Sequence, residues 1–351
     1  WVVSEGPVTA VSLLAPTRLS VRRERLDAEL PSRVADNLFW LGRHIERAEQ
    51  TARLLRSVVT YVTREYMSEG TPELVALLHV LVEMEIIPPQ LREPMALPAL
   101  EHQLSLLFKI DTYPGVLRTN LGEVRRIAST VRDRLSLDTW RILNQLQQDF
   151  HLRHGRIQLD DVLVHLNRMI TDLAAFSGME MESMTRGHGW LFLDIGRRLE
   201  RSLAATRLVR SALGAHPSHI AMLEPMLEVA DSSMTYRRRY FAEAQLAPVL
   251  DLVLADVTNP RALAFQLAAM AALVAQLPRH EKAPSPTREE RTIVHAIDAL
   301  GSADFDALSQ PGADEAFDRL TDLLDLLEAD LRGVSDTITL HYFSHAEQRV
   351  S

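Results

Sequence analysis

Two short segments of this sequence repeat one pattern of arginine and glutamate, and this pattern is the clearest sign of chemistry in the chain. The runs from Gly42 to Arg47 and from Gly196 to Arg201 both read Gly-Arg-x-x-Glu-Arg, and they lie 154 positions apart. Each run continues into Arg-Leu-x-Arg, at 53–56 and at 207–210. Seven of the fifteen positions from 42 to 56 are identical to their counterparts. This repeat predicts two similar halves related by a pseudo-twofold axis.

The two arginines of each run lie one helical turn apart, so they can present two guanidinium groups to a carboxylate or a phosphate. The glutamate between them can hold these groups in place, or it can act as an acid or base if it is removed from water. Two further residues, on one face of a later helix, are expected to be second-tier contacts for the same anion. The candidate residues for binding an anion or substrate are therefore Arg43, Glu46, Arg47, Arg197, Glu200, Arg201, Tyr236 and Arg239.

The pattern leaves three interpretations open: a structural network of ion pairs, a binding site for an anion or peptide tail, and a catalytic centre. A network would be complete if nearby acids, among them Glu49, Glu182 and Asp194, neutralise the arginines. An enzyme instead predicts a pocket open to solvent in which Glu46 or Glu200 is unpaired. We favour a non-catalytic role and assign no catalytic residue.

Helical periodicity indicates how these charges are positioned. Apolar residues recur every three or four positions along the first motif segment and form one stripe, while Trp40, Leu54 and Val58 flank the arginines on the other side. The helix is therefore expected to pack on both sides, with its charges in a partly buried interface. The residues of the stripe are Leu38, Leu41, Ile45, Ala48, Ala52, Leu55 and Val59.

Composition limits the class of protein. The net charge of −9 argues against general nucleic-acid binding. The absence of cysteine suits a cytoplasmic protein, and we expect neither a signal peptide nor a membrane span. His341 and His345 have the spacing of a zinc pair, but no third ligand is evident, so no metal site is predicted. Because the chain begins with Trp1, we expect it to be part of a longer product.

Strand signals are almost absent after residue 31, so the predicted fold class is all-α, a helical bundle of two pseudo-twofold related repeats. Residues 1–31 read as a short extended tail, and residues 32–351 as one helical domain with repeats at about 32–180 and 181–351. Within the second repeat, continuous helices are predicted over 182–213 and 217–244.

Several motifs resemble those of the bacterial alpha-E proteins, a helical family named for its Glu-Arg motif. The resemblance covers about residues 32–346 and implies an all-α domain with the Glu-Arg pattern at its centre. The segments that carry it are Ser32–Glu49, Glu182–Arg186, Gly196–Arg201, Ser232–Tyr240, Thr258–Arg261 and Tyr342–His345.

The segment from Trp1 to Leu14 resembles the C-terminal end of circularly permuted ATP-grasp ligases, which occur fused to alpha-E proteins or encoded beside them. Such ligases join a carboxylate to an amine through an acyl phosphate. The resemblance implies that this chain is the partner domain of an amine-carboxylate ligase, and that it binds the ligase or an acidic peptide or phosphate substrate. ATP and Mg are then expected only in the ligase, because no phosphate-binding glycine loop occurs here. The alternatives are an independent enzyme that uses the Glu-Arg centre, and a structural oligomerisation module.

Overall fold

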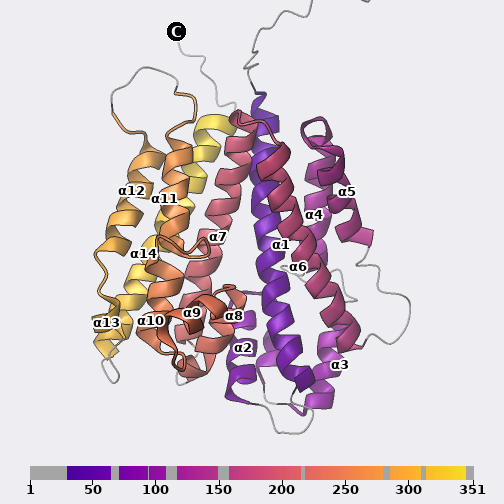
Figure 1. Ribbon diagram of the computed structural model, residues 1–351, viewed down its shortest axis with the longest axis vertical. Helices are drawn as coiled ribbons and strands as arrows, with labels where there is room; N and C mark the ends of the chain where they lie inside the picture. The colour runs from indigo at the N-terminus through magenta and orange to yellow at the C-terminus, as the bar shows by residue number, and fades with distance from the viewer. Residues whose placement is uncertain are drawn as a thin grey trace, which may run out of the picture.

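The protein is an elongated bundle of helices (Figure 1). Every regular element that the structure describes is helical, so the predicted all-α fold class is confirmed. The computed structural model describes residues 30–64, 71–93, 95–107, 117–148, 158–214, 218–279, 285–309 and 314–344.

Two long helices form the centre of the bundle. They are α1 (Ser32–Arg64) and α7 (His188–Gly214), which contain the two Glu-Arg runs and pack against each other. Both helices run from the upper to the lower end of the molecule in Figure 1, so they are parallel. The two motif faces therefore meet over a long contact rather than at a single crossing point.

Each central helix is covered on its outer side by its own set of helices. On the α1 side, α4 and α6 contact α1 while α5 packs on both of them; on the α7 side, α11 and α14 contact α7 while α12 packs on both. Figure 1 shows the first set to the right of the central pair and the second set to its left. These helices are α4 (Leu117–Thr130), α5 (Leu137–Gln148), α6 (Leu159–Ser183), α11 (Leu263–Val274), α12 (Arg288–Gly301) and α14 (Asp314–Ile338).

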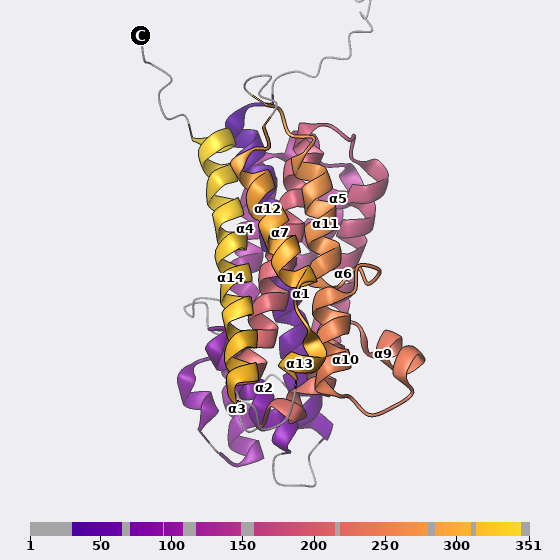
Figure 2. The same cartoon turned by 90° about the vertical axis from the view of Figure 1, so that its left-hand side faces the viewer.

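Shorter helices close the lower end and one side of the bundle, where Figure 2 shows α9 projecting at the edge. The α-helices among them are α2 (Pro72–Glu83), α3 (Leu97–Leu107), α8 (Leu223–Val229), α9 (Ser233–Tyr240), α10 (Leu246–Leu250) and α13 (Phe305–Leu308). The remaining turns are η1 (Pro89–Arg92), η2 (Arg132–Arg134), η3 (Ser218–Met222), η4 (Asp251–Ala255) and η5 (Thr339–Phe343), of which η4 and η5 are π-helical.

The apolar stripe of α1 lies in the core. All seven stripe residues are buried, and so are Leu54 and Val58 on the other side of the helix. The prediction that this helix packs on both sides is therefore confirmed. A helix that is surrounded in this way must bury its charged residues too, and Arg43 and Glu46 are only 8% and 4% exposed.

Two predicted helices were drawn too long. The segment 217–244 is divided into η3, α8 and α9, because Asp231 and Phe241 adopt left-handed backbone angles, with φ of 53° and 48°. Such angles end a right-handed helix, and neither position has the glycine that normally signals one. The helix predicted from residue 182 begins only at His188, since α6 continues to Ser183 and a short turn follows.

The predicted extended tail, residues 1–31, lies outside the described residues except for its last two positions. The internal duplication and the boundary between repeats near residue 180 stay predictions. The buried apolar residues of both halves form one continuous core.

Candidate functional site: the Glu-Arg centre

Two glycines bring the central helices into close contact. A Cβ atom on Gly42 would lie 2.2 Å from the carbonyl oxygen of Leu193, and one on Gly196 would lie 2.1 Å from that of Phe39. No side chain fits at such a distance, so the first residue of each Glu-Arg run is required to be glycine by the approach of the other helix. The contact is reciprocal, because positions 39 and 193 are counterparts in the repeat register.

One turn further on, each helix supplies a glutamate to the two arginines of the other. Arg43 Nε and Arg47 Nε donate to the two carboxylate oxygens of Glu200, at 2.8 and 2.9 Å. Both oxygens of this glutamate are thus occupied by guanidinium groups. The motif glutamate of α7 is 4% exposed, so the pair of hydrogen bonds lies inside the protein.

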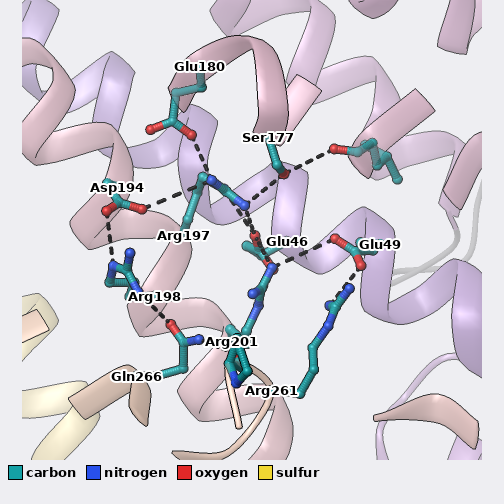
Figure 3. Close-up of polar contacts among 12 residues, drawn as sticks. Glu46, Glu49, Ser177, Glu180, Asp194, Arg197, Arg198, Arg201, Arg261 and Gln266 are labelled. Carbon is teal, nitrogen blue, oxygen red and sulfur yellow. Dashed lines mark hydrogen bonds and ion pairs between the residues drawn. The ribbon is translucent and has the colours of Figure 1, made fainter. Parts of the chain in front are cut away.

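Glu46 of α1 has the equivalent arrangement (Figure 3). Arg197 donates to Oε1 from Nε and Nη2 at 3.0 and 2.8 Å. Arg201 donates to Oε2 and Oε1 from Nε and Nη2 at 2.9 and 2.8 Å. The six motif residues therefore form two sets, each with one carboxylate and two guanidinium groups, and each set links the two central helices.

A serine from the outer helices completes each set. Arg197 Nη2 donates to the hydroxyl of Ser177 on α6 at 2.7 Å, and Arg43 Nη1 donates to that of Ser335 on α14 at 2.8 Å. Because α6 packs on α1 and α14 packs on α7, each of these hydrogen bonds reaches from one side of the bundle to the other. The Glu-Arg centre thus connects four helices.

The two sets differ in charge. Arg197 also donates to Glu180 at 2.7 Å and lies 4.0 Å from Asp194, which in turn accepts from Arg198 at 2.9 Å. At the position equivalent to Asp194, α1 has Trp40, whose ring lies 4.6 Å from the guanidinium carbon of Arg43. One half therefore stabilises its buried arginine with additional carboxylates, and the other stabilises it with a cation–π contact.

A second carboxylate on α1 extends the centre toward the lower end of the bundle. Glu49 accepts from Arg53 at 2.9 Å and from Arg261 at 2.8 Å, and Arg201 lies 3.9 Å from it. A cavity of about 30 Å³ lies against Glu46, Glu49, Arg201 and Arg261. That volume has room for about one water molecule and none for a metabolite.

The acidic residues of the centre differ in the direction of their pKa shifts. Burial alone would raise the pKa of Glu200, but Arg43 and Arg47 offset this and hold the pKa below its usual range. Burial also acts on Glu49, where nearby arginines lower the pKa to about 2. Glu180 is different, because its burial raises the pKa and the single charge of Arg197 does not compensate. Its Oε1 atom is buried with no hydrogen-bond partner in the part of the chain that the structure describes.

These contacts determine what the centre can do chemically. Both oxygens of Glu46 and both oxygens of Glu200 accept hydrogen bonds from guanidinium groups, so neither carboxylate presents an oxygen without an arginine partner to a substrate. The two glutamates also occupy the space between the arginines in which we expected an anion. An anion would have to displace one of them, so anion binding there stays a prediction. The geometry itself is that of a structural ion-pair network.

Tyr236 and Arg239 lie on the projecting α9 and bind to residues outside the Glu-Arg centre. The hydroxyl of Tyr236 donates to the carbonyl of Glu243 and accepts from the backbone N–H of Gln245, while Arg239 pairs with Asp256 at 2.6 Å. The structure therefore brings together six of the eight candidate residues and gives these two other roles.

Sequence reasoning missed four members of the centre, namely Ser177, Glu180, Arg261 and Ser335. Glu180, and not the expected Glu182, neutralises Arg197; Glu182 itself is exposed. Arg261 pairs with Glu49 even though the pattern around it resembles a helix cap. The signal available for Glu180 was its spacing from the start of the second motif helix, but the turn after Ser183 decides which glutamate faces inward.

No group of three or more histidine, aspartate or glutamate residues among those described is arranged to hold a metal ion. The described helices also include none that is long and apolar enough to cross a bilayer.

The fold and the centre define a class of protein, an all-α bundle in which a glutamate of each central helix pairs with two arginines of the other. A sequence model of the Alpha-E family, described as a predicted alpha-helical domain with a conserved ER motif, matches residues 30–343. The chain therefore belongs to the Alpha-E family. Its two Glu-Arg pairs that lie in the interface are Glu46-Arg47 and Glu200-Arg201.

The chain is also similar to uncharacterized proteins of Mycobacterium tuberculosis and Mycobacterium bovis. Each is 32% identical over 327 residues, which is 88% of this chain and 36% of the relative. The chain thus spans about a third of the length of these relatives. No solved structure gives a significant match.

Proposed function

We propose that this chain is the helical partner domain of an ATP-grasp amine-carboxylate ligase system, and that it binds the ligase or an anionic peptide or phosphate substrate. The observation that carries this proposal is the closed state of the Glu-Arg centre, in which both motif glutamates are ion-paired and only about 30 Å³ is open. A centre of this kind holds helices in place, and neither motif glutamate is left unpaired for catalysis. An independent enzyme built on it is therefore disfavoured.

Two further observations support the partnership. The N-terminal segment resembles the end of a circularly permuted ATP-grasp ligase, and the mycobacterial relatives are much longer than the part that matches. The additional length of those relatives could contain the ligase whose chemistry this chain lacks. The rigid bundle would then present a surface to that ligase or to its substrate.

The test is a reconstitution with a circularly permuted ATP-grasp ligase encoded beside an alpha-E protein. Size-exclusion chromatography with light scattering reports whether the two proteins form a complex. ADP release in the presence of an amine and an acidic peptide reports whether the chain stimulates ligation. We expect a complex and at least a tenfold faster release. Separate elution together with an unchanged rate would contradict the proposal.

A structural oligomerisation module is a second candidate, because large apolar side chains are exposed on and beside α9. Phe241 is 88% exposed and Met234 is 70% exposed. If self-association is the main role, light scattering of the chain alone will give a dimer or larger species, and Phe241→Ser will return it to a monomer.

A further inference from the structure

A cleft of about 810 Å³ lies at the lower end of the bundle, away from the close contact at Gly42 and Gly196. It is lined by the C-terminal ends of α2 and α7 and by α14, which meet in the lower part of Figures 1 and 2. A volume of this size is within the range of about 300 to 1,000 Å³ for small-molecule sites. The cleft can therefore hold a ligand that the Glu-Arg centre cannot.

Three arginines of the cleft wall converge on one buried carboxylate. Arg207 Nε donates to Glu328 at 2.9 Å, Arg210 Nη1 donates to it at 3.2 Å, and Arg332 Nε donates to it at 3.2 Å. The Glu328 side chain is 7% exposed. Arg207 and Arg210 are the arginines of the second Arg-Leu-x-Arg run, so the cleft uses a part of the second copy that does not contribute to the Glu-Arg centre.

The arrangement leaves guanidinium charge available to a ligand. Three arginines share Glu328 and one further carboxylate, Asp325, which pairs with Arg210 at 2.9 Å. The arginine side chains are 38% to 63% exposed although each is anchored at one end. Within the described residues, Arg207 forms its hydrogen bond through Nε alone. The N–H groups of its two terminal nitrogens are therefore available to a ligand. Anchored arginines with free donors are preorganised for a carboxylate or phosphate.

The rest of the lining selects between these two anions. Glu83 at the end of α2, Glu85 just after that helix and Asp318 from α14 also face the cleft. A phosphate or nucleotide carries several negative charges, and Glu85 and Asp318 would repel it, whereas Glu83 is already paired with Arg92. A peptide combines a carboxylate for the arginines with an amino group that the acidic residues would attract. The mixture of charges thus favours a zwitterionic ligand.

We infer that this cleft binds a short peptide, with a carboxylate of the peptide held by Arg207, Arg210 and Arg332. Glu328 acts as a positioning residue, because it fixes the three guanidinium groups without being accessible itself. This inference deepens the proposed function by naming a site and a substrate class, and it rests on that proposal for its biological meaning. Binding to the isolated chain tests it directly.

The experiment is isothermal titration calorimetry of the whole chain with four ligands. They are the tripeptide alanyl-alanyl-glutamate, its analogue alanyl-alanyl-glutaminamide, in which amides replace both carboxylates, inorganic phosphate and ADP. We expect the acidic peptide to bind and the amidated analogue to bind at least tenfold more weakly. Tighter binding of phosphate or ADP than of the peptide would overturn the inference, and so would the absence of peptide binding.

Variants locate the site. Arg207→Gln and Arg210→Gln should each weaken peptide binding at least tenfold, while the two remaining arginines keep Glu328 paired and the fold intact. Arg332→Gln provides a third variant if either of these unfolds. The matched control is Arg141→Gln, whose exposed side chain pairs with Asp138. Both residues belong to α5, which Figure 1 shows on the side of the bundle opposite α14. Equal affinity in the cleft variants and the control would overturn the inference.

The two proposals fail separately. Peptide binding without a ligase complex would refute the partnership and leave the cleft site standing. A ligase complex without peptide binding would do the reverse.

Discussion

Among the side chains of the Glu-Arg centre, Arg197 is the one whose removal should lower the free energy of unfolding most. Its side chain is 9% exposed, and its loss would deprive two buried carboxylates of a counter-charge. Glu46 would keep Arg201, but the carboxylate of Glu180 would lose the one guanidinium that donates to it among the described residues. Breaking a buried ion pair from one side costs about 3 to 5 kcal/mol. We therefore expect Arg197→Met to lower the free energy of unfolding by that amount, and the melting midpoint by roughly 5 °C for a chain of this size.

The measurement is urea unfolding followed by circular dichroism, with two comparison variants. Arg47→Met should cost about 1 kcal/mol or less, because that side chain is 39% exposed and Glu200 keeps its hydrogen bond from Arg43. Adding Glu180→Gln to Arg197→Met should recover about 1 to 3 kcal/mol, since the uncompensated charge is then gone. If Arg197→Met is no more costly than Arg47→Met, or if the double variant recovers nothing, the reasoning about buried charge is refuted.

Three further predictions concern the close contact and the titrating acids. Gly196→Ala should destabilise by about 3 kcal/mol or more, since its Cβ would overlap a main-chain oxygen of α1, whereas Gly122→Ala has open space and should be neutral or stabilising; equal melting midpoints would contradict this. Glu180 has a raised pKa, so its contribution to stability is lost as the pH rises above 4.5, and the stability of Glu180→Gln relative to the parent should improve over that range in pH-dependent unfolding. Glu49 has a pKa lowered to about 2, so its contribution is present above 4.5 and is lost as the pH falls toward 2. Acid titration should therefore show a smaller loss of stability for Glu49→Gln than for the parent, by a difference on the order of 3 kcal/mol; parallel acid curves would rule this out.

The sequence alone was enough for the first central helix. The apolar stripe and the flanking residues predicted a helix that packs on both sides, and α1 spans Ser32–Arg64 with both sides buried. Periodicity works here because the helix is long and its pattern is repeated many times. It failed over 217–244, where the backbone reverses at Asp231 and Phe241 without glycine. A left-handed residue of that kind is imposed by tertiary packing and leaves no local pattern.

The candidate site could be predicted from the sequence only in part. The repeat indicated which arginines and glutamates matter, but it could not show that each glutamate pairs with the opposite helix, because that depends on the parallel approach at Gly42 and Gly196. Glu180 and Arg261 reach the centre from other helices or turns, and their register is set by turns that have no strong local signal. Local pattern therefore indicates the motif residues, while their partners follow from the tertiary structure.

The reciprocal glutamate–arginine pairs between α1 and α7 also determine which part of this chain can fold as a unit. A fragment that ended before His188 would contain Arg43 and Arg47 without Glu200, and Glu46 without either of its arginines. The complementary fragment would have the opposite deficit. Each half is thus incomplete alone and complete with the other. The short turn between α6 and α7 joins the halves and sets which glutamate of α6 reaches Arg197, but the Glu-Arg pairs between α1 and α7 are made by residues outside it. Two separately made halves would be expected to recombine into one bundle, held together by the same pairs of glutamate and arginine that now lie within a single polypeptide.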